Sequence, residues 1–370
     1  MKRILMNTAL LLAVLLVFSC NQSPLFYNIS KETPPKNPII AGQPSKIVEF
    51  SGQLYAANGT VWVYAGSSWT RLASQPAGNV RDVAATTGAL YALTVDGTGS
   101  LSTTLYKSTN GTSWTPVSNT PSYPILGGGL FGAGDTLFVG AKNSGGTSAA
   151  VLYDNNGSLT VALDNITTSG SVPGTLAGAV KMGTNYYLAV TGMGVYASSL
   201  TSFSSANPIT GSTDTKYRLN GLIAVGNKVV AVGSGGYMLA GDSTTGFSEV
   251  SGACDTSYPY TGALAVWTDP SNSANKLLLV GRRYSTYTNG YWEIGLTTSG
   301  DLPGTVSLNK PGSSSPTTVT DKSTYEQSLG QKVLTALYQA PGGTLGTTLF
   351  ASTLKDGLWA YRNGTWNAEE

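Results

Sequence analysis

The residue types that carry out most enzyme chemistry are scarce in this chain of 370 residues. It contains no histidine and two cysteines, Cys20 and Cys254. Catalytic arrangements of Ser with His or of Cys with His, and zinc sites built on histidine, are therefore excluded. Asp82, Asp269 and Asp356 are the acids that we nominate for glycan cleavage by paired carboxylates, but none belongs to a recognisable pair. We therefore expect no catalytic residue, no metal and no cofactor.

Arginine and tyrosine form the more informative polar group. Both are enriched in binding hot spots, and both suit contact with a peptide or a carbohydrate. The candidate binding face consists of Arg81, Asp82, Tyr217, Arg218, Tyr258, Tyr260, Arg282, Arg283, Tyr284, Tyr287 and Asp356. The alternative interpretation is that the charges are solvated and the tyrosines anchor loops.

Two short motifs match binding fingerprints by letter but not by context. Gly127, Gly129 and Gly132 have the spacing of a dinucleotide-binding loop, but a turn and a strand follow them where a helix is required. We interpret them as glycines at positions where strands crowd together. Asp154 and Gly157 could belong to a calcium loop, but no downstream glutamate completes it, so we interpret this segment as a turn.

The elements that must position the candidate residues form a repeat. Short apolar or β-branched strands, separated by glycine-rich turns, recur from residue 46 to the C-terminus. Units of about four strands begin near residues 46, 80, 126, 176, 219, 261 and 332. One such unit cannot bury both of its faces, so the units must pack on one another. The pattern predicts an all-β, seven-bladed β-propeller with four short antiparallel strands per blade; six or eight blades are the alternatives.

The propeller prediction places the candidate residues. In a propeller, the loops between consecutive blades and the loops between second and third strands open on the same face. This mapping brings the arginines and tyrosines of the candidate binding face to the same end of the ring.

The first and last units carry nearly the same hairpin. Trp62, Tyr64 and Trp69 have the same spacing as a second set near the C-terminus, which consists of Trp359, Tyr361 and Trp366. Because side chains alternate along a strand, the first two residues of each set share a face. A closed ring makes the first and last blades neighbours, so we expect these faces to stack at or beside the closure. An open solenoid is the alternative.

The segment "STNGTSW", from Ser108 to Trp114, resembles the Asp-box of sialidase-like and photosynthesis-assembly-factor-like propellers. Asn110 stands in place of the Asp, and the spacing is one residue shorter; "YDNNGSL" and "YRNGTW" are weaker echoes. The resemblance implies that the motif holds the turn between the outer strands of a blade, with Trp114 in a structural role. The Arg-Ile-Pro signature of sialidases is absent near the start, so sialidase activity is not expected.

The N-terminus has the features of a bacterial lipoprotein leader. Lys2 and Arg3 precede an apolar run, and Ser19 stands directly before Cys20, which resembles a lipobox and implies lipidation of that cysteine. A secretory peptide or a single membrane anchor are the alternatives, although the apolar run is short for a spanning helix. We predict a signal peptide at residues 1–19, an extended tether at 20–45 and a propeller at 46–370.

Two further features of the domain can be predicted. An insertion at residues 297–331 interrupts the repeat, and its segment Ser323–Glu326 predicts a short helix that stops at Gly330. With Cys20 lipidated, Cys254 has no disulfide partner, and we expect it to be a small buried hydrophobe.

Charge excludes one class of partner. Loss of Lys2 and Arg3 with the leader lowers the number of Lys and Arg from 21 to 19, which equals the 19 Asp and Glu residues. A formally neutral chain lacks the basic field that nucleic-acid binding requires.

The leader and tether, "SCNQSPLFYNISKETPPKNP", followed by short β repeats, resemble a group of spirochaete (treponeme-type) envelope lipoproteins without an established activity. This resemblance implies a lipid-anchored envelope protein, at the outer membrane or cell surface rather than the inner membrane. We expect a non-enzymatic binding or scaffolding propeller that engages a protein, peptide or glycan through its loop face. The alternatives are a glycan-active hydrolase that has a sialidase-like propeller architecture and uses carboxylates, and a structural factor in envelope assembly.

Overall fold

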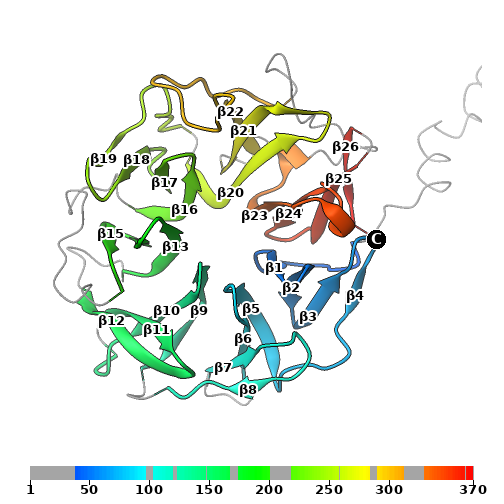
Figure 1. Ribbon diagram of the computed structural model, residues 1–370, viewed down its shortest axis with the longest axis vertical. Helices are drawn as coiled ribbons and strands as arrows, with labels where there is room; N and C mark the ends of the chain where they lie inside the picture. The colour runs from blue at the N-terminus through cyan, green and yellow to red at the C-terminus, as the bar shows by residue number, and fades with distance from the viewer. Residues whose placement is uncertain are drawn as a thin grey trace, which may run out of the picture. The chain divides into compact units, whose positions relative to one another are not determined.

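Seven antiparallel sheets follow one another along the chain and form the blades of a ring around a central opening (Figure 1). Each blade begins within about two residues of its predicted start. The predicted all-β propeller with seven blades is therefore confirmed. The computed structural model describes residues 38–96, 103–119, 123–146, 148–166, 174–200, 218–257, 259–283, 290–311, 329–362 and 364–369.

Within every blade, neighbouring strands of the sheet are consecutive in the chain. Blades 1 to 3 contain β1 (Val48–Phe50), β2 (Gln53–Asn58), β3 (Thr60–Tyr64), β4 (Trp69–Arg71), β5 (Asn79–Ala85), β6 (Leu90–Val95), β7 (Thr103–Ser108), β8 (Thr115–Pro116), β9 (Ile125–Ala133), β10 (Thr136–Lys142), β11 (Ala149–Asn155) and β12 (Ser158–Ile166). Blades 4 and 5 contain β13 (Leu176–Met182), β14 (Asn185–Val190), β15 (Gly194–Ser198), β16 (Leu219–Val225), β17 (Lys228–Gly233), β18 (Met238–Asp242) and β19 (Gly246–Glu249). Blades 6 and 7 contain β20 (Tyr260–Asp269), β21 (Asn272–Arg282), β22 (Tyr291–Gly295), β23 (Leu334–Gln339), β24 (Leu349–Thr353), β25 (Leu358–Arg362) and β26 (Thr365–Ala368). Two 3₁₀ helices, η3 (Leu329–Gln331) and η4 (Gly343–Leu345), complete the described elements.

Blades 4 and 6 have three strands each within the described residues, and the other five blades have four. In blade 6, Asn309 exchanges backbone hydrogen bonds of 2.8 and 3.0 Å with Glu293 of β22. Val306 is buried beside it in the core between blades 5 and 6. The first part of the predicted insertion 297–331 therefore forms the outer edge of a blade. The predicted helix lies outside the described residues, apart from its end, where η3 is found.

The hydrophobic core lies between the blades. The buried residues form seven clusters, and each cluster joins two neighbouring blades. Strand β6 shows how the sequence produces this arrangement. Its Leu90 and Ala92 pack toward blade 1, whereas Tyr91 and Leu93 pack toward blade 3. Because successive side chains of a strand point to opposite faces, a continuous apolar run serves two interfaces at once.

Blades 1 and 7 close the ring. Tyr64 and Trp69 of blade 1 are buried against Phe350 of blade 7, with ring centroids 5.3 and 5.7 Å from that phenylalanine. Trp62 packs on the edge of the same cluster. The prediction that this hairpin lies at the closure is confirmed.

The C-terminal hairpin packs elsewhere. Trp359 and Trp366 are buried with Tyr291 of blade 6, and Tyr361 packs on the edge of this cluster. The prediction that the two hairpin faces stack on one another is therefore wrong. In both blades the Trp-x-Tyr face packs on the preceding blade of the ring. Blade 7 packs on blade 6, and blade 1 packs on blade 7.

A short segment before β1 also belongs to the closure. Ile39 donates its backbone N–H to Glu369 (2.7 Å), Leu358 donates to Ile40 (3.0 Å), and Gly357 donates to Gly42 (2.8 Å). We call residues 38–42 the clasp. The propeller unit begins at Pro38, so residues 38–45, which the sequence assigned to the tether, belong to the folded unit. No helix within the described ranges is long and apolar enough to cross a membrane.

The turn between β7 and β8 has the structure that the Asp-box resemblance implied. The side-chain oxygen of Asn110 accepts hydrogen bonds from the Ser108 hydroxyl (3.1 Å) and from the backbone N–H groups two and three residues later (2.9 and 2.8 Å). Trp114 donates its indole N–H to the backbone oxygen of Ser74 (3.1 Å). Asp242 holds a similar turn between β18 and β19, which the sequence analysis missed.

The glycine motif has the predicted structural role at Gly129 and Gly132, whereas a Cβ atom at Gly127 would meet nothing within 4 Å, so the prediction of crowded strands is wrong for Gly127. Gly127, Gly129 and Gly132 lie within β9, so the segment is a strand and not a phosphate-binding loop. A Cβ atom at Gly132 would stand 1.7 Å from the backbone oxygen of Ala85 in the neighbouring blade. Glycine is required here because the inner strands approach one another closely.

Candidate functional site

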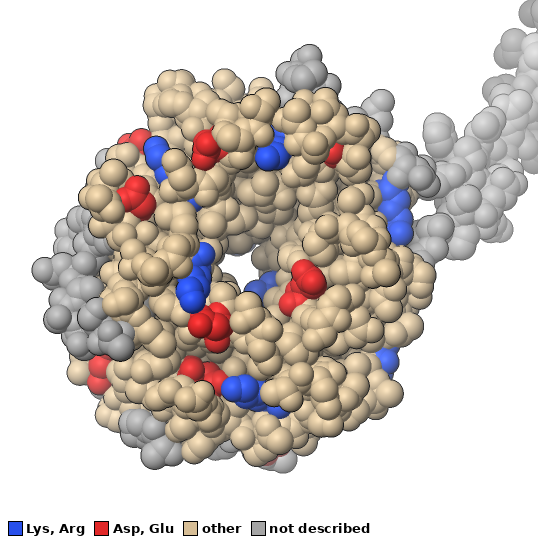
Figure 2. Space-filling view, viewed as in Figure 1, with Lys and Arg blue, Asp and Glu red and all other residues tan. Residues whose placement is uncertain are grey.

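A cavity of about 1860 Å³ occupies the centre of the ring and is lined by residues of all seven blades. Figure 2 shows one face of the ring, with the opening at its centre and both basic and acidic side chains beside it. Most of the lining residues lie at the start of an inner strand or at the end of a second strand. Antiparallel pairing brings these two positions to the same end of the channel.

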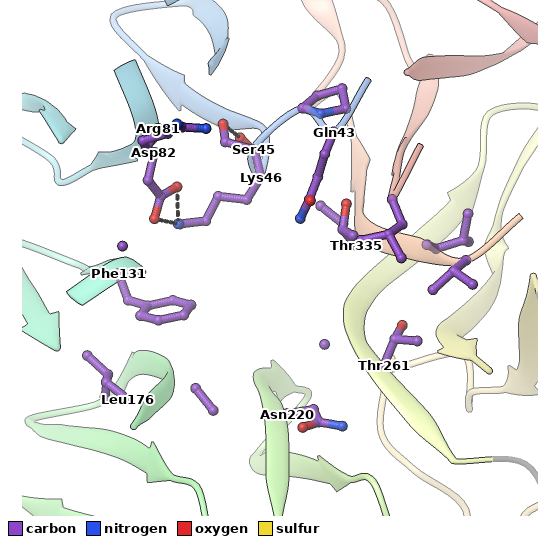
Figure 3. A pocket seen from close by; sticks show the side chains of 18 of the residues that line it. Gln43, Ser45, Lys46, Arg81, Asp82, Phe131, Leu176, Asn220, Thr261 and Thr335 are labelled. Atoms are coloured by element: carbon purple, nitrogen blue, oxygen red, sulfur yellow. Dashed lines mark hydrogen bonds and ion pairs between the residues drawn. The ribbon is translucent and has the colours of Figure 1, made fainter. Parts of the chain in front are cut away.

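A buried ion pair lies in the channel wall between blades 1 and 2. The Lys46 ammonium donates to both carboxylate oxygens of Asp82, at 2.6 and 2.7 Å, and Figure 3 shows the two side chains pointing toward one another. Asp82 is 3% exposed and also accepts from the backbone N–H groups of Val83 (2.9 Å) and Leu130 (3.3 Å). Lys46 lies 4.8 Å from the centre of the Phe131 ring. This charge is therefore fully compensated.

Three other cations line the cavity and are exposed. Arg81 lies near the start of the inner strand of blade 2, Lys142 ends the second strand of blade 3, and Arg283 follows the second strand of blade 6. No ion pair joins any of them to an acid in the described part of the chain. We call the end of the channel where these three residues lie the channel mouth.

Neutral polar side chains lie between the charged ones. Asn58 and Asn220 donate their amide N–H groups to the backbone oxygens of Ala41 and Tyr260, the latter at 2.7 Å. Their amide oxygens have no hydrogen-bond donor among the described residues. Gln43 also lines the cavity, and Figure 3 shows its side chain reaching into the open space.

The structure places four of the eleven predicted binding residues at the cavity: Arg81, Asp82, Tyr260 and Arg283. Tyr260 is not available to a ligand, because its ring is 1% exposed and its hydroxyl donates to the backbone oxygen of Ala253. Burial raises the pKa of this phenol. The alternative interpretation, that the tyrosine anchors a loop, therefore holds for Tyr260.

Arg282, Arg218 and Asp356 do not line the cavity. Arg282 is 6% exposed and stacks on Trp292, with 4.1 Å between the guanidinium carbon and the ring centre. Arg218 is exposed just before β16. Asp356 forms an ion pair of 3.0 Å with Lys332 beside the clasp. Another four predicted residues, Tyr217, Tyr258, Tyr284 and Tyr287, lie outside the described residues.

The three acids nominated for catalysis, Asp82, Asp269 and Asp356, do not gather at the cavity. Asp82 is the only acid among the described residues that line the cavity. Asp269 is the last residue of β20 and does not line the cavity. Although partial burial opposes it, hydrogen bonds from Ser271 and Asn275 lower the pKa of Asp269. No group of three or more acids and cysteines suited to a metal occurs in the described part of the chain.

Other predictions need correction or addition. Cys254 is exposed, so the prediction of a buried hydrophobe is wrong. The segment around Asp154 is a turn, as predicted, and its carboxylate binds Lys107 at 2.8 Å and Tyr91 at 2.5 Å. The sequence analysis missed Lys46 and Lys142. The repeat could have predicted Lys46 as a channel residue, because this residue stands at the start of the first unit.

Comparison with known proteins assigns the chain to a family and supports the propeller fold. A family model described as the TP013X lipoprotein family matches residues 1–332. No curated protein sequence matches the chain. Among solved structures, an ancestral GH74 enzyme is similar over 90% of this chain and 47% of its own length, with 17% identity and a TM-score of 0.58. The chain thus spans about half of that enzyme, and likeness at this identity shows the fold alone.

Two further propellers have lower scores. YCF48 bound to D1 peptide is similar over 89% of this chain and 96% of its own, with 12% identity and a TM-score of 0.46. The WD40 propeller domain of Doa1 is similar over 89% of this chain and 95% of its own, with 9% identity and a TM-score of 0.49.

Proposed function

The chain belongs to the TP013X lipoprotein family, and on that premise we propose that it is an envelope-anchored, non-enzymatic binding protein that holds its ligand at the channel mouth. In this proposal Cys20 carries the lipid, and the residues before Pro38 link the anchor to the propeller. The protein stands at the outer membrane or cell surface, with its ligand a molecule of the envelope or its surroundings.

One observation carries the proposal. Arg81, Lys142 and Arg283 line an open cavity without acidic partners in the described part of the chain, and the one further described cation of the lining, Lys46, is paired with Asp82. Exposed charges that stabilise nothing in the fold are available for recognition. Ligand sites combine apolar walls with a few convergent polar groups, and this cavity has both.

The two alternatives have less support. A hydrolase acting through paired carboxylates needs a second acid within about 9.5 Å of the first, and the one described acid of the lining, Asp82, is salt-bridged to Lys46. A purely structural assembly factor requires no pocket, and a flat loop face would fit it. The cavity of about 1860 Å³ favours a binding role over that alternative.

The test is a binding screen with the full chain purified in mild detergent. Arrays of glycans and of peptides are probed with the wild type, with Arg81→Ala/Arg283→Ala, and with the matched control Arg71→Ala/Lys228→Ala. The control removes two exposed cations that do not line the cavity. We expect ligands that bind the wild type and the control and are lost from the mouth variant, with circular dichroism showing that all three proteins are folded.

A ligand that the mouth variant retains at full affinity would place the binding site elsewhere. A screen without any ligand on either array would count against the binding function itself.

A further inference from the structure

We infer that the ligand held at the channel mouth is an acidic oligosaccharide, with its carboxylates bound by Arg81, Lys142 and Arg283 and its hydroxyl groups bound by the amide side chains of the channel wall. This inference rests on the proposed binding function and names the class of ligand.

The charge of the cavity supports an anion. Four cations and one acid are present among the described lining residues, and the acid is neutralised by Lys46 and by backbone donors. The other three cations form no ion pair with an acid among the described lining residues. The cavity is therefore positively charged, although the predicted net charge of the mature chain is zero. Four further acids stand within two residues of the lining in the sequence, and none of them lines the cavity: Glu49, Asp96, Asp255 and Asp356.

The positions of the cations indicate more than one anionic group. Arg81 and Lys142 belong to the neighbouring blades 2 and 3, whereas Arg283 belongs to blade 6, on another side of the ring (Figure 1). A single carboxylate can bridge two neighbouring side chains but cannot reach across the mouth. An extended ligand with repeated carboxylates can contact all three, and arginine can bind each carboxylate through two parallel hydrogen bonds.

The channel wall favours a sugar over a peptide. The free amide oxygens of Asn58 and Asn220 accept hydrogen bonds, and they lie on blades 1 and 5. The ligand must therefore present hydrogen-bond donors at separate points around the propeller ring. A sugar ring carries hydroxyl donors around its whole edge, whereas an extended peptide presents its N–H groups along one line. Gln43 adds an amide that can both donate and accept.

The size of the cavity agrees with an oligomer. Pockets for small ligands occupy roughly 300–1,000 Å³, and this cavity occupies about 1860 Å³. It can hold several sugar units in contact with both sides of the mouth. The partly buried Phe131 ring, with Lys46 over it, adds apolar surface to the cavity wall on the side of blade 3 (Figure 3).

The test uses titration calorimetry on the full chain in detergent with two acidic probes. They are oligosaccharides of galacturonic acid, and oligosaccharides of alternating glucuronic acid and N-acetylglucosamine. Controls are the same sugars with their carboxyl groups reduced to alcohols, and oligoglutamate of equal charge. We expect at least one acidic probe to bind, and its carboxyl-reduced form to bind at least about tenfold more weakly. Binding should also weaken with rising salt.

Variants assign the binding to the mouth. Arg81→Ala, Lys142→Ala and Arg283→Ala should each weaken it, Arg81→Ala/Arg283→Ala by at least about tenfold, and Arg71→Ala/Lys228→Ala should bind as the wild type does. Equal affinity for the reduced sugars would overturn the role of the carboxylates. Binding of oligoglutamate without either sugar would overturn the saccharide class; both results leave the proposed binding function standing. Failure of all the probes overturns this inference, and the array screen then decides separately whether any binding function remains.

Discussion

At the scale of single residues, the cations of the channel fall into two kinds. Lys46 is paired with Asp82 and lies over Phe131, whereas Arg81 and Arg283 are exposed and have no acidic partner among the described residues. A partly buried, paired charge contributes to stability, and removing one partner is costly because the other is left uncompensated. Substitutions of these residues should therefore separate stability from binding.

Lys46→Met should lower the free energy of unfolding by about 2 kcal/mol, because the Asp82 carboxylate stays buried with backbone donors alone. Urea unfolding at neutral pH measures this loss. In the double variant with Asp82→Asn, the uncompensated charge is gone, so the loss should be smaller than the sum of the two single losses. Strict additivity would show that the pair contributes no coupling energy.

Asp135 gives a prediction on pH. Its carboxylate accepts hydrogen bonds from Tyr186 (2.5 Å) and Lys181 (2.9 Å), which lower its pKa to about 2. Because the unfolded-state pKa is about 3.9, the stabilisation is fully present above about pH 4 and is lost as the pH falls toward 2.

Asp135→Asn should therefore be less stable than the wild type at neutral pH. The loss should stay below about 1 kcal/mol because the carboxylate is 62% exposed and water screens it. Unfolding curves across a pH series should converge near pH 2. A difference that persists unchanged at that pH would contradict the assignment.

The site could be predicted only in part, and the neighbours Arg282 and Arg283 show why. The repeat register placed both in the loop between a second and a third strand, but Arg282 is the last residue of β21 and Arg283 follows it. Successive residues of an extended chain point to opposite sides. One arginine therefore stacks on Trp292 while the next one lines the cavity. The pattern of a single sequence does not say which of the two faces the channel. Lys142 was missed because it ends a strand whose apolar residues gave the whole repeat signal.

At the scale of elements, the blade register was predictable because turns and apolar runs are local features. The blade against which each Trp-x-Tyr face packs was not predictable, because it depends on which blades are adjacent in the closed ring. Trp69 meets Phe350 of blade 7, and Trp366 meets Tyr291 of blade 6 and donates its indole N–H to that hydroxyl (3.1 Å). Equivalent positions in the repeat thus stabilise different interfaces.

Two matched substitutions test this arrangement. Trp69→Ala and Trp366→Ala each remove a fully buried ring and should each cost roughly 3–5 kcal/mol. Hydrogen exchange should locate the two losses differently. Trp69→Ala should raise exchange in β24 and β25, whereas Trp366→Ala should raise it in β21 and β22. The same exchange pattern in both variants would contradict the assignment of the two hairpins to different interfaces.

At the scale of the whole molecule, the clasp connects the closure of the ring to the channel. Residues 38–42 pair with the last blade, and residues 43–47, which follow without a break, line the cavity. Ser45 marks the junction, since its backbone oxygen accepts from the Ser352 hydroxyl (2.9 Å) and its N–H donates to Ala57 (2.7 Å). The N-terminal end of the folded unit therefore passes directly beside the candidate binding site.

This continuity predicts that loosening the clasp disturbs the channel. Ile40 is 1% exposed in the closure cluster, and Ile40→Ala should cost roughly 2–5 kcal/mol. Ile294→Ala is the matched control, because this isoleucine is equally buried but lies between blades 5 and 6. Hydrogen exchange under native conditions should rise in residues 43–47 for Ile40→Ala and stay unchanged there for Ile294→Ala. Equal protection of this segment in both variants would mean that the clasp closes the ring without shaping the channel.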